Sequence, residues 1–267
     1  MKIVILMEDT CGSPHCVHEH GLSVYVETQK HKLLVDTGAT AAFLDNADAL
    51  GIDLAKVDTV VLSHGHYDHA GGILAFYERN PNAAIYMQRS ACGDYYHDAR
   101  YIGIDKRISK LKSVRMLDGD YRIDEELRLF TNITGRKYFA KSNLLLSKRV
   151  NGRRIQDTFA HEQCLVVTQG QEHTLISGCA HNGILNILSR YYESCCNDPV
   201  AVISGFHMMK KGDYTQEEAQ IVLDTAKQLC GMDTVFYTGH CTGDKALALM
   251  APIMGEKLVQ IHSGMVL

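Results

Sequence analysis

Residues 59–72 read TVVLSHGHYDHAGG, and this stretch decides the fold class. It begins with a short apolar, β-branched run, Thr59–Leu62, which is typical of a buried strand. Directly after the run come three histidines and one aspartate, namely His64, His66, Asp68 and His69. Imidazole and carboxylate are common metal ligands, and Gly65 lets the backbone approach closely. The density of these groups favours a metal-binding loop at the end of a strand over a polar surface loop with incidental histidines.

The spacing within this loop indicates two adjacent metal positions. His64 and His66 are two residues apart, so their side chains point the same way in an extended turn. Asp68 and His69 lie about one turn further along the chain. Each pair could therefore serve one of two neighbouring ions.

The composition is that of an ordinary globular protein. The chain has 267 residues, of which 46% are hydrophobic and 22% charged, and this excludes disordered, collagenous and coiled-coil classes. The formal net charge is −4 and the basic residues form only short pairs, such as Arg153-Arg154. We therefore expect no nucleic-acid binding.

Cysteine usage and the N-terminus point to a cytoplasmic protein. Nine cysteines are an odd number, and Cys195 and Cys196 are adjacent, which suits a reducing compartment. The N-terminal apolar run Ile3–Met7 is too short for a signal peptide or a membrane span, and it reads as a first strand. We expect no membrane association.

Apolar runs predict strands in both halves of the chain. The predicted strands cover residues 2–7, 22–27, 32–35, 59–62, 84–87, 127–130, 143–147, 165–168, 173–177, 200–203, 234–237 and 258–261. The predicted helices cover residues 41–50, 73–79, 183–192, 216–229 and 244–254. Thr215 and Glu218 are spaced as a capping box at the start of the fourth of these helices.

This order of elements predicts two similar β-rich halves that pack face to face with helices outside. No Pro/Gly/Ser-rich linker separates the halves, so we expect residues 1–267 to form one domain. The segment from Ser90 to Lys112 is polar and helical at best. It carries Tyr95, Tyr96 and Tyr101, and we interpret it as an inserted lid over a cleft, with a plain surface excursion as the alternative.

The chain resembles a known family in several motifs. These are Glu19–Ser23, Val35–Gly38, Ser63–Gly72, Gly178–Gly183, Gly205–His207 and Thr238–Gly243. The strand followed by His-x-His-x-Asp-His is similar to that of the metallo-β-lactamase-fold hydrolases. More narrowly, the set looks like the branch that contains 7,8-dihydropterin-6-ylmethyl-4-(β-D-ribofuranosyl)aminobenzene-5′-phosphate synthase. The resemblance implies an α/β protein with a four-layer αββα sandwich and two metal ions between its sheets.

By this resemblance, His64 and His66 hold one metal ion, and Asp68 and His69 hold the other. Further ligands are expected after strands of the second half, and His181 and His240 are our candidates. Many relatives have a Ser-Gly-Asp turn that supplies a bridging carboxylate, but this chain reads Ser177-Gly178-Cys179.

Four more residues have candidate roles around the metals. Cys179 is a possible ligand or a small buried apolar residue. His207 could bind a metal or a substrate anion or be structural, and His20 could line the cleft. Asp36 is expected to accept a hydrogen bond from a ligand imidazole.

The expected cofactors are two divalent metal ions, with zinc first and manganese or iron as alternatives, because histidine and carboxylate suit all three. The expected function is a metal-dependent hydrolase of a small anionic, phosphorylated metabolite. A hydroxide activated by the dinuclear centre would attack the substrate, and Asp68 would act as ligand and proton acceptor.

Three other functions stay open from the sequence. The metals could activate a nucleophile other than water, which would make the protein a transferase of the pterin-phosphate type. The protein could bind a small molecule without turnover. An iron oxidoreductase is a further possibility, although 267 residues leave no room for a flavin domain.

Overall fold

The N-terminal half builds a six-stranded sheet in the order β1-β2-β3-β4-β5-β8. The first three strands are antiparallel, and β3, β4, β5 and β8 run parallel. The strands are β1 Lys2–Met7, β2 Ser23–Glu27, β3 Lys32–Val35, β4 Thr59–Val61, β5 Ala84–Gln88 and β8 Val114–Leu117. The helices of this half are α1 Ala42–Ala49, α2 Tyr67–Ala70 and α3 Ile73–Arg79.

The C-terminal half builds a seven-stranded sheet in the order β17-β16-β15-β14-β13-β10-β9. In this sheet β9, β10, β13 and β14 pair with one another in antiparallel fashion, and β14, β15, β16 and β17 run parallel. They are β9 Tyr121–Arg122, β10 Leu127–Phe130, β13 Cys164–Gln169, β14 Glu172–Ile176, β15 Ala201–Ile203, β16 Val235–Thr238 and β17 Leu258–Gln260. The helices are α4 Ile184–Tyr192, α5 Gln216–Cys230 and α6 Asp244–Met254.

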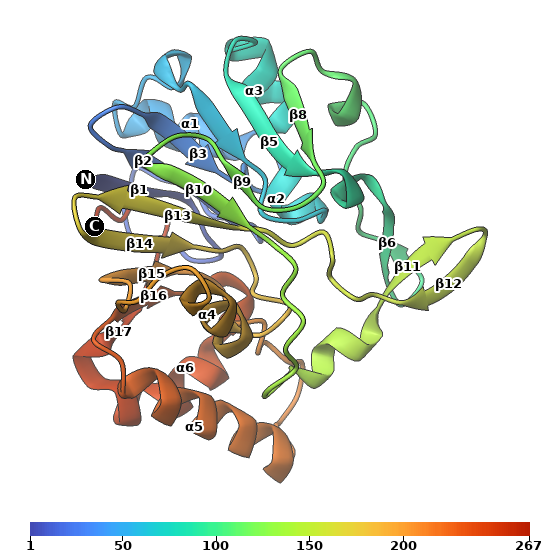
Figure 1. The fold of residues 1–267 in the computed structure, drawn as a ribbon, viewed down its shortest axis with the longest axis vertical. Helices are drawn as coiled ribbons and strands as arrows, with labels where there is room; N and C mark the ends of the chain where they lie inside the picture. Colours follow the sequence, from blue (N-terminus) through green and yellow to red (C-terminus); the bar gives the residue numbers. More distant parts are fainter.

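Figure 1 shows this computed structural model, which describes residues 1–267. Helices α1 and α3 cover the outer side of the first sheet, and α5 and α6 cover the outer side of the second. A third sheet of four strands lies beside them in the order β12-β11-β6-β7. Its strands are β6 Asp94–His97, β7 Arg100–Tyr101, β11 Leu146–Val150 and β12 Arg153–Gln156.

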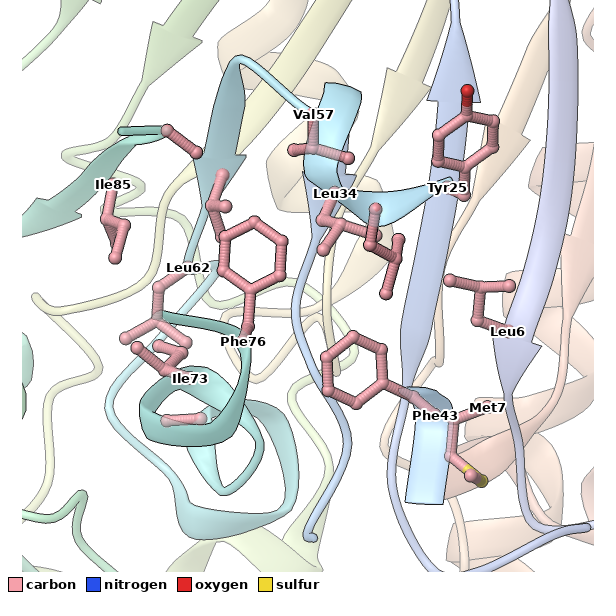
Figure 2. Close-up of a cluster of buried hydrophobic side chains, with 14 of the residues drawn as sticks. Leu6, Met7, Tyr25, Leu34, Phe43, Val57, Leu62, Ile73, Phe76 and Ile85 are labelled. Atoms are coloured by element: carbon pink, nitrogen blue, oxygen red, sulfur yellow. The ribbon is translucent and has the colours of Figure 1, made fainter. Parts of the chain in front are cut away.

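Burial on both faces of each main sheet produces the four layers. Leu33 and Val35 of β3 pack between the two sheets, whereas Leu34 faces the helices. Figure 2 shows the helix side, where Phe43 of α1 and Phe76 of α3 pack near Leu34. Burial of each such aliphatic or aromatic side chain stabilises the folded state by about 1.5–3 kcal/mol. Both layers of contact therefore add to the stability of the fold. The αββα prediction is confirmed.

Most predicted elements form close to their expected bounds. The capping box is also present: Thr215 Oγ1 accepts from the Glu218 N–H, and the Glu218 carboxylate accepts from the Thr215 N–H. No helix of the structure combines the length and apolarity that a membrane crossing requires.

The sequence interpretation of residues 90–112 as helical at best is wrong. The segment contains β6 and β7, which pair with each other and, through β6, with β11. The strand predicted at 143–147 is displaced, because Lys141–Leu145 form a 3-10 helix and β11 begins at Leu146. Its hairpin partner β12 was missed, although Asn151 and Gly152 at the turn have φ of 50° and 77°. Asn-Gly between two strands is a strong hairpin signal. That the chain is one domain with a lid stays a prediction.

His31 joins the two main sheets at the β2–β3 turn. Its Nδ1 lies 2.8 Å from Asp58 Oδ1 and its Nε2 lies 2.6 Å from Asp124 Oδ2. Burial opposes protonation, but Asp124 and Asp58 together raise the pKa of His31 above its ordinary value of 6.5. The stability that these ion pairs give the folded protein is therefore complete below the pKa of His31 in the unfolded chain. It is lost as the pH rises through the pKa of His31 in the folded protein.

Replacing His31 with Asn should lower the melting temperature more at about pH 6 than at about pH 9. The expected loss at the lower pH is up to about 1 kcal/mol, because the pair is only partly shielded from solvent. Thermal unfolding of both proteins across this pH range measures the difference, and pH effects from other sites cancel. An equal loss at all pH values would contradict the ion-pair role.

Candidate metal centre

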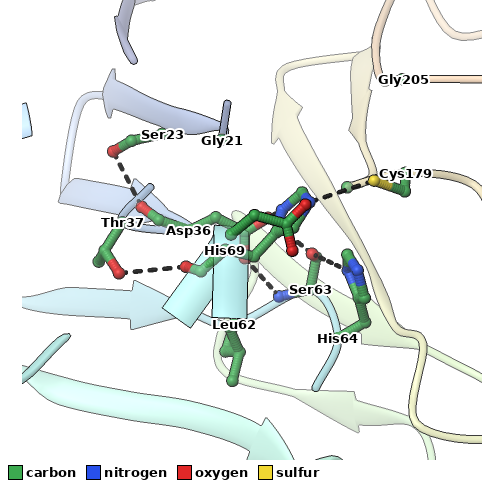
Figure 3. A network of polar contacts seen from close by, with 12 residues as sticks. Gly21, Ser23, Asp36, Thr37, Leu62, Ser63, His64, His69, Cys179 and Gly205 are labelled. Carbon is green, nitrogen blue, oxygen red and sulfur yellow. Dashed lines mark hydrogen bonds and ion pairs between the residues drawn. The ribbon is translucent and has the colours of Figure 1, made fainter. Parts of the chain in front are cut away.

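The Asp36 carboxylate organises the loop that follows β4 (Figure 3). Asp36 is fully buried at the end of β3 and has a φ of 61°. It accepts hydrogen bonds from the Ser63 N–H at 2.7 Å, the Ser63 hydroxyl at 2.6 Å and His69 Nδ1–H at 2.6 Å. One carboxylate thus fixes both ends of the His64–His69 loop.

Four histidines are held in the same tautomer by such partners. His69 Nδ1–H donates to Asp36, and His64 Nδ1–H donates to Ser63 Oγ at 2.9 Å because that hydroxyl already donates to Asp36. His181 donates to Asn143 Oδ1 at 3.1 Å, and His240 donates to Asp9 Oδ1 at 2.6 Å. A neutral ring that carries its proton on Nδ1 keeps the lone pair on Nε2, which is the form that binds a metal.

The Nε2 atoms converge on two clusters of ligand atoms. His64, Cys179 and His181 form one cluster, and His69, Cys179 and His240 form the other, with the ligand atoms of each within 4.8 Å of one another. His64 Nε2 and His181 Nε2 are 3.3 Å apart, and His69 Nε2 is 3.1 Å from Cys179 Sγ. Cys179 belongs to both clusters.

Two further loop residues lie beside these clusters. The ring of His66 is 4.7 Å from that of His181, centroid to centroid, and the ligand atom of His66 also groups with those of Asp157 and His161. Asp68 Oδ2 lies 3.5 Å from His240 Nε2 and 3.9 Å from His69 Nε2, so Asp68 adds to the second. That His64 and His66 hold one ion and Asp68 and His69 the other, as the resemblance implies, stays a prediction.

Burial keeps most of these imidazoles neutral. It lowers the pKa of His66 to about 3 and holds those of His64 and His181 well below the ordinary value, with the neighbouring histidines adding to the effect. His240 differs: burial acts against its charge, but Asp68 and Asp9 raise its pKa well above the ordinary value. Asp68 is also opposed by burial, and His69 and His240 still hold its pKa far below the usual range.

The donor set fits two metal ions. His66 Nε2 and His240 Nε2 are buried without a hydrogen-bond partner, which is costly unless another group satisfies them. The lone pairs of His64 and His181 face each other at 3.3 Å, and a cation would relieve that repulsion. Imidazole, thiolate and carboxylate together suit zinc, iron or cobalt.

Buried acceptors hold the backbone of the ligand residues in the second half of the fold. Glu162 Oε1 accepts from the His181 N–H at 2.6 Å, and Glu8 Oε1 accepts from the His240 N–H at 2.5 Å. Burial raises the pKa of Glu162 even though it accepts these bonds. Neither carboxylate is paired with a lysine or arginine; the second oxygen of Glu162 accepts from Asn182, and that of Glu8 accepts from Thr10.

His161 and Asp157 hold the His64–His69 loop at Gly65. His161 Nδ1 accepts from the Gly65 N–H at 2.9 Å, and His161 Nε2–H donates to Asp157 Oδ2 at 3.0 Å. Tyr95 packs on this imidazole with ring centroids 4.0 Å apart. Tyr95 is thus buried against the metal loop.

The two remaining candidates lie at the edge of the clusters. His20 is half exposed; its Nδ1–H donates to Asp9 Oδ2 at 2.8 Å, and its Nε2 lies 3.5 Å from Asp68 Oδ2. The ring of His207 is 4.1 Å from that of His181, and burial lowers the pKa of His207 to about 4. Both could contact a metal or a substrate.

Apart from Asp36, sequence reasoning missed the residues whose side chains hold the candidate ligands in place. They are Glu8, Asp9, Asn143, Asp157, His161 and Glu162. The only available signal was the position of Glu8 and Asp9 directly after the first strand, where polar side chains often reach a site at the strand ends. The others depend on contacts across the sandwich.

Comparisons with known proteins identify the family of the chain. A sequence profile described as the metallo-beta-lactamase superfamily matches residues 18–131. The crystal structure of Tm1679, described as a metal-dependent hydrolase of the beta-lactamase superfamily, superposes with a TM-score of 0.84 at 30% identity. That match covers 100% of this chain and 98% of the other. The chain belongs to the metallo-β-lactamase superfamily.

Two relatives come from Methanocaldococcus jannaschii. An uncharacterized protein is 27% identical over 270 residues, which is 99% of each chain. The 7,8-dihydropterin-6-methyl-4-(beta-D-ribofuranosyl)-aminobenzene-5′-phosphate synthase is 28% identical over 288 residues, which is 100% of this chain and 96% of the synthase. This superfamily member is therefore similar along its whole length to a synthase as well as to a protein described as a hydrolase.

Replacing His161 with Leu should weaken metal binding by about 10–100-fold, because the Gly65 N–H loses its acceptor and the loop loosens. His161→Asn should lose less, since its side-chain oxygen can take the place of Nδ1. Competition with a chelator measures both affinities, and circular dichroism checks the fold. Wild-type affinity in the Leu variant would contradict the positioning role.

Proposed function

We propose that this superfamily member is a metal-dependent hydrolase that acts on a small anionic, phosphorylated metabolite. The observation that carries the proposal is the pair of ligand clusters that share Cys179, with Asp68 beside the second. Two divalent ions held there would polarise a phosphoryl oxygen and acidify water at the site. His64, His66 and His181 would hold one ion, and Asp68, His69 and His240 the other.

The chain's own groups support a role for Asp68 at this place. The Asp68 carboxylate faces the Nε2 atoms of both His20 and His240 at 3.5 Å. Asp9 binds Nδ1 of both imidazoles and so aims them at Asp68. His69 and His240 keep Asp68 ionised, so its carboxylate can bind a metal ion and accept a hydrogen bond from the attacking nucleophile.

An arginine beside the metal loop supports an anionic substrate. The Arg100 guanidinium lies 4.7 Å from the ring centre of Tyr67, which stands between His66 and Asp68 in the loop. The Ile102 carbonyl accepts from the Tyr67 N–H at 2.9 Å, so the segment after β7 is fastened to the loop. Arg100 is exposed and has no carboxylate partner, which leaves its donors available to a phosphate.

A transferase of the pterin-phosphate type is the second candidate, favoured by the full-length similarity to the synthase. Both activities would use the same metal ligands. Turnover in ¹⁸O-labelled water separates them, because hydrolysis places one labelled oxygen in the product and transfer to another nucleophile places none.

Asp68→Asn should lower turnover of a phosphate mono- or diester by at least about 100-fold, even with metal in excess. The amide is a poorer ligand and carries no charge. The test compares turnover of p-nitrophenyl esters with binding of the same compounds in wild type and variant. Wild-type activity that survives exhaustive chelation would contradict the proposal, and metal-dependent binding without any turnover would indicate a sensor.

Arg100→Gln should raise the KM for phosphorylated substrates by roughly tenfold, with little change in kcat, because a charge-assisted hydrogen bond to the substrate is lost. Arg149→Gln is the matched control. Arg149 also stacks on a tyrosine, Tyr96, but on the opposite face of the same sheet. Equal effects of the two substitutions would rule out a specific role for Arg100.

A further inference from the structure

Cys179 stands where the two ligand clusters meet. Its side chain is buried, and its Sγ is the one ligand atom that lies within 4.8 Å of His64 and His181 on one side and of His69 and His240 on the other. The superfamily pattern expects a bridging carboxylate in such a place. In this chain residue 179, after Ser177-Gly178, is a cysteine.

No carboxylate is available for the bridge. Asp36 lies near His64 and His69, but its two oxygens already accept from Ser63 and His69. Asp68 approaches only the cluster of His69 and His240. The carboxylates of Asp9 and Glu162 are likewise engaged with ring or backbone N–H groups of the ligand residues.

The local backbone fixes the thiol in this position. Gly178 packs so closely that a Cβ there would be 2.2 Å from Ser63 Oγ and 3.0 Å from His64 Nδ1. The Gly205 N–H donates to the Gly178 carbonyl at 2.8 Å, and Ala180 has a φ of 52°. The turn therefore presents residue 179 to both clusters, and its side chain has little freedom to leave.

We propose that the Cys179 thiolate bridges the two metal ions in place of a carboxylate. The inference rests on the dinuclear site of the proposed function. Metal binding would release the S–H proton to the solvent, and the thiolate would then offer a lone pair to each ion. A thiolate is a soft ligand, so the bridge selects zinc, iron or cobalt over manganese and magnesium.

Cobalt(II) is the probe for the bridge, because thiolate bound to cobalt gives a sulfur-to-metal charge-transfer band in the near ultraviolet. Metal-free full-length protein is titrated with cobalt(II) while the bound metal is counted. A bridging sulfur should make the band grow through both the first and the second equivalent. A sulfur that binds one ion alone should make it stop after one.

Three variants complete the test. Cys179→Ser should lose the band, and Cys179→Asp should lose it while still binding two ions, with a lower preference for zinc over manganese. Cys241→Ser is the matched control. Cys241 is a buried cysteine that packs near Cys179, with its Sγ donating to the Cys179 carbonyl at 3.5 Å, but it belongs to neither cluster. This variant should keep the band.

The outcomes separate this inference from the proposed function. Two bound cobalt ions without a charge-transfer band, or a band that survives in Cys179→Asp, would overturn the thiolate bridge and leave the dinuclear site intact. A band that saturates after one of two ions would overturn the bridge in favour of a terminal ligand. Failure of the wild type to bind metal would instead contradict the proposed function itself.

Discussion

The hydrogen bonds of the buried Asp36 carboxylate are the constraint on which the site depends. They join the end of β3 to Ser63 after β4 and to His69 in α2, so they determine where the ligand loop leaves the first sheet. A buried carboxylate without these partners would cost several kcal/mol, and each donor left unpaired would cost about 1–3 kcal/mol. The same bonds select the tautomer of His69 directly and that of His64 through Ser63.

Buried hydrogen-bond acceptors also hold the remaining candidate ligand residues in place. The His181 turn is held by Glu162, the His240 turn by Glu8 and Asp9, and Gly65 by His161. None of these acidic groups is neutralised by lysine or arginine. Buried carboxylates that lack a lysine or arginine partner create a negative potential that favours cations between the sheets. Metal binding and the stability of the ligand loops are therefore coupled.

The sequence predicts the parts of the site that are close along the chain. The His64–His69 loop shows its ligands at a spacing that only a turn after a strand explains, and His181 and His240 follow apolar strands in glycine-flanked turns. Side chains along each strand point alternately toward the other sheet and toward the helices, and both sides are apolar. The strands therefore appear in the sequence as apolar runs. The αββα fold could accordingly be predicted in most of its elements.

Other parts depend on contacts that no local pattern encodes. His161 and its Asp157 partner reach Gly65 across 96 residues, and Glu8 reaches His240 across 232. In the sequence alone, His161 looked like any other histidine. The strands β6 and β7 were missed because they are short and polar and gain their order from pairing with the β11–β12 hairpin. The position of Cys179 between both clusters likewise requires the two halves to be assembled.

The most direct test of this account is metal analysis of protein purified without added metal, combined with anomalous X-ray diffraction from its crystals. The account predicts close to two transition-metal ions per chain, with two anomalous peaks about 3.5–4 Å apart, one beside His64 and His181 and one beside His69 and His240. Protein from metal-replete cells that contains no transition metal, or peaks located away from these histidines, would contradict it.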